Sequence, residues 1–171
     1  MLNIKEKLDI KSLSELYNSD YYTWAMTHAE LLKEGRFNEI DYINLAEEVK
    51  DLGLSEYKEL RSYLANLLSH LYKWDNQPDL RTKSWINTIA NSIFHIKKVL
   101  KQNPGLKYEK TFADAFKDAW EEARYIIFSD TEIKFNLIPE ESPYTFKDAI
   151  DKAAEITGIS SKDIFFLNNI L

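Results

Sequence analysis

Residues 45–85 have the sequence LAEEVKDLGLSEYKELRSYLANLLSHLYKWDNQPDLRTKSW. Within this stretch Leu60, Leu64, Leu67 and Leu71 recur at spacings of three and four residues. This period places the leucines on one face of a helix and is typical of the seam of a helical bundle. Pro78 then interrupts the pattern, because proline cannot donate the backbone hydrogen bond that a helix interior needs. The stretch therefore predicts a fold of packed α-helices.

The same period extends to both sides of this stretch, with capping residues between the periodic segments. Asp20 can cap one helix, and Gly35 and Gly53 stand where helices are expected to end. Short connections between successive helices favour antiparallel neighbours. We therefore expect an all-α, up-and-down helical bundle of about five main helices with short terminal helices. The main helices are expected over residues 20–34, 41–53, 55–74, 83–102 and 106–130, and the shorter ones over residues 12–17, over residues 145–157 and from residue 160.

Composition excludes several kinds of protein. The chain has 171 residues, no cysteine and a formal net charge of −6. Without cysteine it can form neither disulfides nor thiolate metal sites, which fits a reducing cytoplasm. No apolar run approaches the roughly 20 residues that span a bilayer, and the acidic balance disfavours nucleic acid. We expect a cytoplasmic chain with an arm at residues 1–18, a bundle core at 19–150 and a helical extension at 151–171.

Several separated motifs resemble one family. They are DYYTW at residues 20–24, GRFNEID at 35–41, LAEEV at 45–49, LGLSE at 52–56, HLYKW at 70–74, Pro78, RTKSW at 81–85 and IPEESPY at 138–144. Their types and order resemble a bacterial family of domains of unknown function, the family numbered 29. The resemblance covers roughly residues 19–150 and implies an all-helical bundle without implying a reaction. That family often has a cysteine where this chain has Ser142, which weakens any thiol chemistry in this loop.

The three histidines do not predict a metal centre. His28 lies on the apolar stripe of its helix and is expected to point inward, and His70 lies on the flank of its stripe. His95 falls opposite Ile93 and Leu100, towards solvent. Three imidazoles on such different faces should not converge on one ion. The bundle signature for paired metals, a glutamate three residues before a histidine, is also absent. We therefore expect no metal and no cofactor.

Glu48, His70 and Arg81 form the one constellation that could carry chemistry. If two antiparallel helices met at Gly53, Glu48 and His70 would come within reach of each other. The pair could then act as an acid and a base, or as half of a metal site. The alternative, which we prefer, is a semi-buried ion pair or hydrogen bond that fixes the register of the helices.

Two further groups could bind a ligand. Ser84 is expected to cap the helix that starts near residue 83 or to lie in its first turn, where free N–H groups favour an anion. The structural alternative pairs Arg81 with an acid such as Asp75 or Glu48, while Trp74 and Trp85 close the corner. The loop at residues 138–144 resembles a clasp that Ile138 and Tyr144 pin to the bundle. Clasps of this kind cover binding sites or simply cover a core.

These observations favour a protein-interaction or ligand-binding helical bundle over an enzyme. The enzyme alternative is a hydrolase-like or metal-dependent one that uses Glu48, His70 and Arg81. The lysines at 97, 98, 101, 107 and 110 lack aromatic stacking platforms, so we expect no nucleic-acid binding. The apolar segment IFFLNNIL at residues 164–171 covers either its own bundle or a second copy. An unidentified protein partner or a homodimer is therefore expected, and no membrane.

Overall fold

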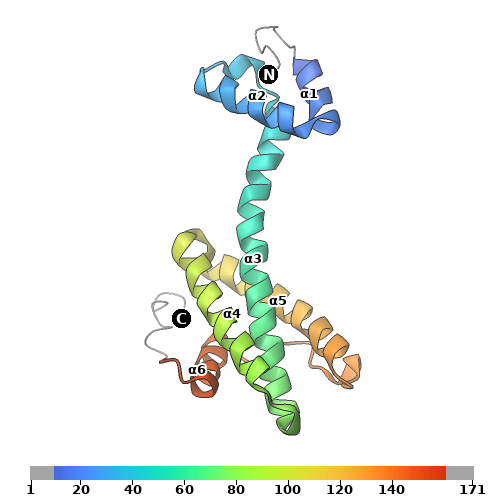
Figure 1. Ribbon diagram of the computed structural model, residues 1–171, viewed down its shortest axis with the longest axis vertical. Helices are drawn as coiled ribbons and strands as arrows, with labels where there is room; N and C mark the ends of the chain where they lie inside the picture. Colours follow the sequence, from blue (N-terminus) through green and yellow to red (C-terminus); the bar gives the residue numbers. More distant parts are fainter. Residues whose placement is uncertain (1–9, 161–171) are drawn as a thin grey trace. The chain divides into compact units, whose positions relative to one another are not determined.

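The structure is a computed structural model that describes residues 10–160 (Figure 1). Its described residues form six α-helices, joined by short 3-10 turns and loops, and no strand. The all-α prediction is therefore confirmed for this part of the chain. The expected helix from residue 160 lies outside the described residues. The helices are α1 (Ile10–Ser19), α2 (Tyr21–Lys33), α3 (Tyr42–Asn76), α4 (Lys83–Gln102), α5 (Glu109–Asp130) and α6 (Phe146–Thr157).

The predicted end of a helix at Gly53 is wrong, because α3 continues through this residue. Gly35 and Gly158, which do end helices, have φ of 72°, whereas Gly53 is not in this left-handed region. A glycine inside a helix costs about 1 kcal/mol relative to alanine, which the surrounding good helix formers can offset. Without a left-handed residue, a proline or an extended loop, nothing stops the helix. The two helices expected over residues 41–53 and 55–74 are therefore one.

Two compact units make up the chain, Met1–Leu54 and Ser55–Leu171, and α3 has residues in both. In the first unit Leu13, Leu31 and Ile40 form a small core, and Leu45 from α3 packs against it. Asp20 caps α2 as predicted, because its side chain accepts a hydrogen bond from the Thr23 amide at 3.1 Å.

The second unit has one apolar core that α3, α4, α5 and α6 share. The predicted seam is confirmed, since Leu60, Leu64, Leu67 and Leu71 are all fully buried. Cross-helix contacts give the directions of the helices. Tyr63 meets His95 and His70 meets Trp85, so α4 runs antiparallel to α3, whereas the pairs Tyr57–Asp118 and Lys73–Asp130 make α5 parallel to it. The chain therefore runs down, up and down through these three helices, as expected of an up-and-down bundle.

Candidate functional site

Glu48 is held by two tyrosines of its own unit. Its two carboxylate oxygens accept hydrogen bonds from the hydroxyls of Tyr17 and Tyr21, at 2.7 Å and 2.6 Å. These hydrogen bonds lower the pKa of Glu48, and the same contact raises the pKa of Tyr17 to about 12. Both tyrosine rings pack against Trp24, which is 2% exposed. Glu48 therefore stays ionised while it ties α3 to α1 and α2.

His28 is buried, as its place on the apolar stripe predicted, and both of its ring nitrogens are used. Nδ1 donates to the backbone oxygen of Trp24 at 2.8 Å, and Nε2 accepts the amide proton of Asp41 at 3.0 Å. This pair of contacts requires the neutral ring with its proton on Nδ1. The imidazole therefore fixes the start of α3 and has no nitrogen left for a ligand.

His70 belongs to the second unit and is half-buried. Its Nδ1 lies 2.9 Å from the backbone oxygen of Asn66, one turn earlier in α3. Burial, followed by the nearby ammonium of Lys73, lowers the pKa of His70 below 6.5. Lys73 is itself buried and pairs with Asp130 at 2.8 Å. His70 is therefore a neutral imidazole beside a structural ion pair.

His95 does not point to solvent as predicted. Its ring stacks on Tyr63 with 4.3 Å between the ring centroids and 8° between their planes. Its Nδ1 is buried and has no hydrogen-bond partner among the described residues. The helical wheel gave the wrong direction because it ignores neighbouring helices, and here the flat face of Tyr63 on α3 covers the ring.

Arg81 packs on the end of α3. Its Nε donates to the backbone oxygen of Trp74 at 2.9 Å, and its guanidinium carbon lies 4.8 Å from the centroid of the Trp74 ring. The expected pairing of Arg81 with Asp75 is wrong. Asp75 instead takes the ammonium of Lys152 and the hydroxyl of Tyr144, each at 2.7 Å.

The helix α4 begins at Lys83, as predicted. Thr82 caps the helix, since its hydroxyl accepts the Trp85 amide at 3.4 Å. Ser84 lies in the first turn, which was the second of the two expected positions. The ring of Trp85 lies edge-on to His70 at 6.5 Å. Through these contacts, Thr82, Trp74 and Trp85 form the corner between α3 and α4.

The structure does not form the hairpin that was to unite Glu48 with His70. The two residues lie on one continuous helix, in different compact units, and each has its own partners. The sequence did not indicate that Tyr17 and Tyr21 are the hydrogen-bond partners of Glu48. A signal was present, because both tyrosines flank the cap at Asp20, next to the apolar residues that bring α1 and α2 together.

The loop at residues 138–144 is a clasp, as predicted. Ile138 is 2% exposed, and the hydroxyl of Tyr144 reaches Asp75 at the end of α3. The sequence did not indicate a third attachment, in which the indole N–H of Trp120 donates to the backbone oxygen of Pro139 at 3.1 Å. Burial and the Asp75 carboxylate strongly raise the pKa of Tyr144, so its phenol stays protonated.

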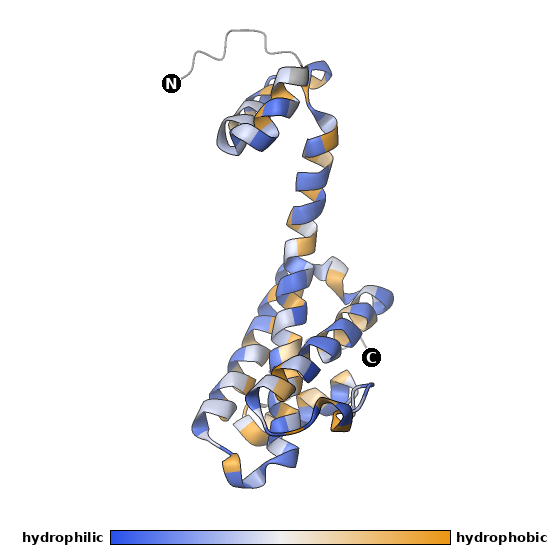
Figure 2. Ribbon diagram, turned by 90° about the vertical axis from the view of Figure 1, so that its right-hand side faces the viewer, coloured by the Kyte–Doolittle hydropathy of each residue, from blue (hydrophilic) through white to orange (hydrophobic). Residues whose placement is uncertain are grey.

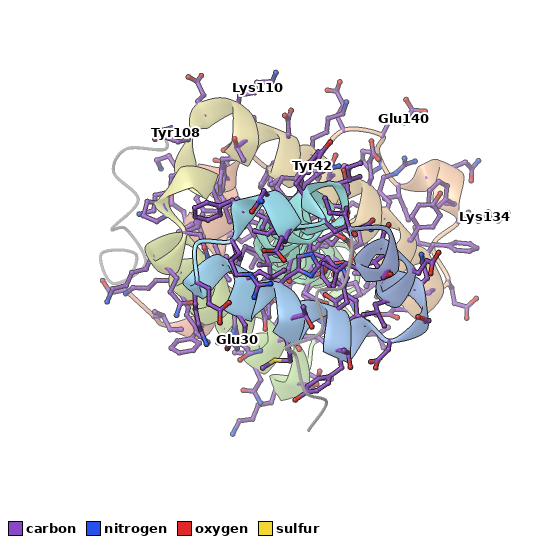
Figure 3. All side chains as sticks on the ribbon, turned by 90° about the horizontal axis from the view of Figure 1, so that it is seen from above. Glu30, Tyr42, Tyr108, Lys110, Lys134 and Glu140 are labelled. Carbon is purple, nitrogen blue, oxygen red and sulfur yellow. The ribbon has the colours of Figure 1, made fainter. Side chains whose placement is uncertain are left out.

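One face of α3 in the first unit is apolar and uncovered. Tyr42, Val49 and Leu52 are 71%, 61% and 71% exposed, and the small residues Ala46 and Gly53 beside them are exposed too. At about 100° per residue these five residues, here called the Tyr42 face, lie within an arc of about 120°. They extend over roughly 16 Å of helix. Apolar bands recur along this part of α3 in Figure 2, and Tyr42 is labelled in Figure 3.

Comparison with known proteins gives one match. The model of the family described as "Domain of unknown function DUF29" matches residues 16–154, most of the chain. The chain belongs to the DUF29 family. The match confirms the resemblance inferred from the motifs and includes residues of both compact units. No curated protein and no solved structure matches the chain significantly.

None of the helices in residues 10–160 is both long enough and apolar enough to cross a membrane.

Proposed function

We propose that this DUF29 protein is a bacterial cytoplasmic interaction module that binds an amphipathic helix of another protein on its Tyr42 face. The observation that carries the proposal is the exposure of Tyr42, Val49 and Leu52 on one side of a helix. Contiguous apolar patches on the surface of a protein mark interaction sites. The lack of cysteine fits the reducing compartment.

The small residues of the Tyr42 face support a helix as the partner. At about 100° per residue, Ala46 and Gly53 lie along one edge of this face, where their small size lets a second backbone approach closely. Gly53 is unexplained by the fold of its own chain, because it lies within α3 and a Cβ there would meet no atom within 4 Å outside the backbone of its own helix. A docking helix supplies the reason for a glycine that otherwise costs about 1 kcal/mol.

The charge around the Tyr42 face favours a basic partner over a second copy of the chain. Residues 41–59 have six carboxylates and two lysines, a net charge of −4. Two such segments side by side would repel each other, whereas lysines and arginines that flank the apolar stripe of a partner helix would be attracted. The occupant we propose is therefore an amphipathic helix with basic flanks.

Binding of two synthetic helical peptides tests this function. Both peptides carry the same leucine and alanine stripe, one with lysine flanks and the other with glutamate flanks, and fluorescence anisotropy measures their affinities. We expect the protein to bind the lysine peptide more tightly. The double substitution Val49→Gln and Leu52→Gln should weaken that binding at least about tenfold, since it removes two apolar contacts.

Ile43→Gln is the matched control, because Ile43 is 64% exposed on the same helix but lies about 120° round it from Val49. The control should bind the lysine peptide as the unmodified protein does. Equal binding of both peptides, or an equal loss in both variants, contradicts the proposal. Sedimentation that shows a dimer dissociated by the double substitution would make a second copy the occupant instead.

A further inference from the structure

The second unit has a pocket between α5 and the clasp loop, far along the chain from the Tyr42 face. Its volume is about 360 Å³, within the range of small-molecule sites. Tyr144 lines the pocket on the loop side, and Ala113, Phe116 and Trp120 line it on the α5 side. Because Ala113, Phe116 and Trp120 follow the helical spacing of three and four residues, one face of α5 forms the floor.

The polar atoms of these walls are already occupied. The indole N–H of Trp120 donates to Pro139, and the hydroxyl of Tyr144 donates to Asp75. The Ser142 hydroxyl donates to the backbone oxygen of Tyr144 at 2.9 Å and accepts its amide proton at 3.2 Å. The walls are therefore held in place without a ligand, and most of the lining is apolar.

Unpaired carboxylates remain at the rim. Glu121, Glu140 and Glu141 line the pocket, against one basic side chain, Lys117. These three glutamates make no hydrogen bond or ion pair within the described part of the chain. The four groups together carry a net charge of −2, and Figure 3 shows Glu140 on the outer side of the loop.

We propose that this pocket binds an organic ammonium ion with an aromatic or alkyl body. The apolar body would lie against the half-buried rings of Phe116 and Tyr144, and the cation would lie at the rim, where the carboxylates attract it. A bare metal ion fits poorly, because Mg²⁺ and Ca²⁺ need several oxygen ligands around them and this floor is apolar. A carboxylate ligand would be repelled by the glutamates.

To test this, each of three probes of nearly the same shape is added in increasing amounts to the full chain. The probes are 2-phenylethylamine, 2-phenylethanol and 3-phenylpropanoate. Tryptophan fluorescence and the NMR signal of the Trp120 indole N–H report binding. We expect the amine to bind about tenfold more tightly than the alcohol, and the carboxylate to bind least. The preference for the amine should shrink as salt is raised, because the rim is exposed.

Two variants separate the charge of the rim from the shape of the pocket. Glu140→Gln combined with Glu141→Gln should weaken the amine about fivefold and leave the alcohol unchanged. Ala113→Leu, at an exposed position on the floor, should weaken both. The control is Glu132→Gln, an exposed glutamate outside the pocket.

The proposal fails if the amine and the alcohol bind equally, or if the control weakens the amine as much as the rim variant does. It also fails if none of the probes gives a saturable change up to about 10 mM, since even a weak specific site should be occupied there.

Discussion

His28 positions the first turn of α3 through two hydrogen bonds that involve no other side chain. One ring nitrogen donates to Trp24 and the other accepts from the Asp41 amide, inside a site where the imidazole is 1% exposed. Buried polar groups that lose a partner cost more than the hydrogen bond itself contributes. At the scale of single residues, the attachment of α3 in the first unit therefore depends on one neutral imidazole and on the carboxylate of Glu48.

Replacing His28 by phenylalanine should expose this dependence. A six-membered aromatic ring replaces the imidazole, but the Asp41 amide loses its partner, whereas the Trp24 carbonyl keeps the helical hydrogen bond from the backbone N–H of residue 28. We therefore expect a loss of about 1–3 kcal/mol in the stability of the first unit. Hydrogen exchange at the Asp41 amide measures it, and exchange should be much faster in the variant. Unchanged exchange at Asp41 would show that the imidazole does not hold this amide.

The titration of His70 gives a prediction for pH. Burial and Lys73 hold the pKa of His70 below 6.5, so the unfolded chain takes up this proton at a higher pH than the folded protein does. The free energy of unfolding should therefore fall as the pH drops below 6.5, until it passes the pKa of the folded state. NMR titration of the imidazole and urea unfolding at about pH 7.5 and pH 5.5 measure both effects.

The variant His70→Gln serves as the control, because it removes the contribution of this imidazole and should make the dependence between about pH 7.5 and pH 5.5 smaller. A folded pKa for His70 at or above 6.5 would contradict the buried, uncharged imidazole. Asp130 adds a separate loss at more acidic pH, since Lys73 lowers the pKa of its carboxyl below 3.8.

For the helices, the periodic segments were predicted well, and one predicted boundary, at Gly53, is wrong. Asp20 and Gly35 lie where the sequence placed them, because the first uses a local contact and the second a local φ. Gly53 was mistaken for a boundary because glycine ends a helix only when its backbone turns left-handed. Residue type alone does not reveal that.

Gly53→Ala tests the continuity of α3. In a continuous helix with open space at this position, alanine should stabilise the protein by about 0.5–1 kcal/mol. Urea unfolding with circular dichroism at the helical band measures the change. Ala46→Gly, the reverse exchange on the same face, should destabilise by a similar amount. Destabilisation by Gly53→Ala would mean that residue 53 has backbone dihedral angles that alanine cannot adopt without strain.

The clasp offers a second prediction at this scale. Tyr144→Phe removes the hydroxyl that Asp75 accepts, and we expect a loss of about 1 kcal/mol together with faster proteolysis of the loop at residues 138–144. Tyr125→Phe is the control, because Tyr125 is 66% exposed on α5 and outside the clasp. Equal proteolysis of the two variants would show that the hydrogen bond to Asp75 does not hold the loop.

At the scale of the whole molecule, fold and site were predictable to different degrees. The apolar period was enough to predict an all-α chain, because burial repeats along each helix, and the separated motifs carried the resemblance to the family. The candidate site depended on which distant residues meet, and the hairpin that was to join Glu48 with His70 is absent because α3 continues past Gly53. Exposure of the Tyr42 face could not be read from the sequence either, since its spacing is the same as that of the buried seam.

The proposed function requires the Tyr42 face to bind a basic amphipathic helix. The most direct measurement is the NMR spectrum of the full chain with labelled valine, leucine and isoleucine methyl groups, recorded as the lysine-flanked peptide is added. We predict saturable shifts at Val49 and Leu52 and none at Ile43, which lies about 120° round the same helix from Val49. Shifts of equal size at Ile43 and Val49, or no shifts at Val49 and Leu52 while the peptide binds, would contradict the account.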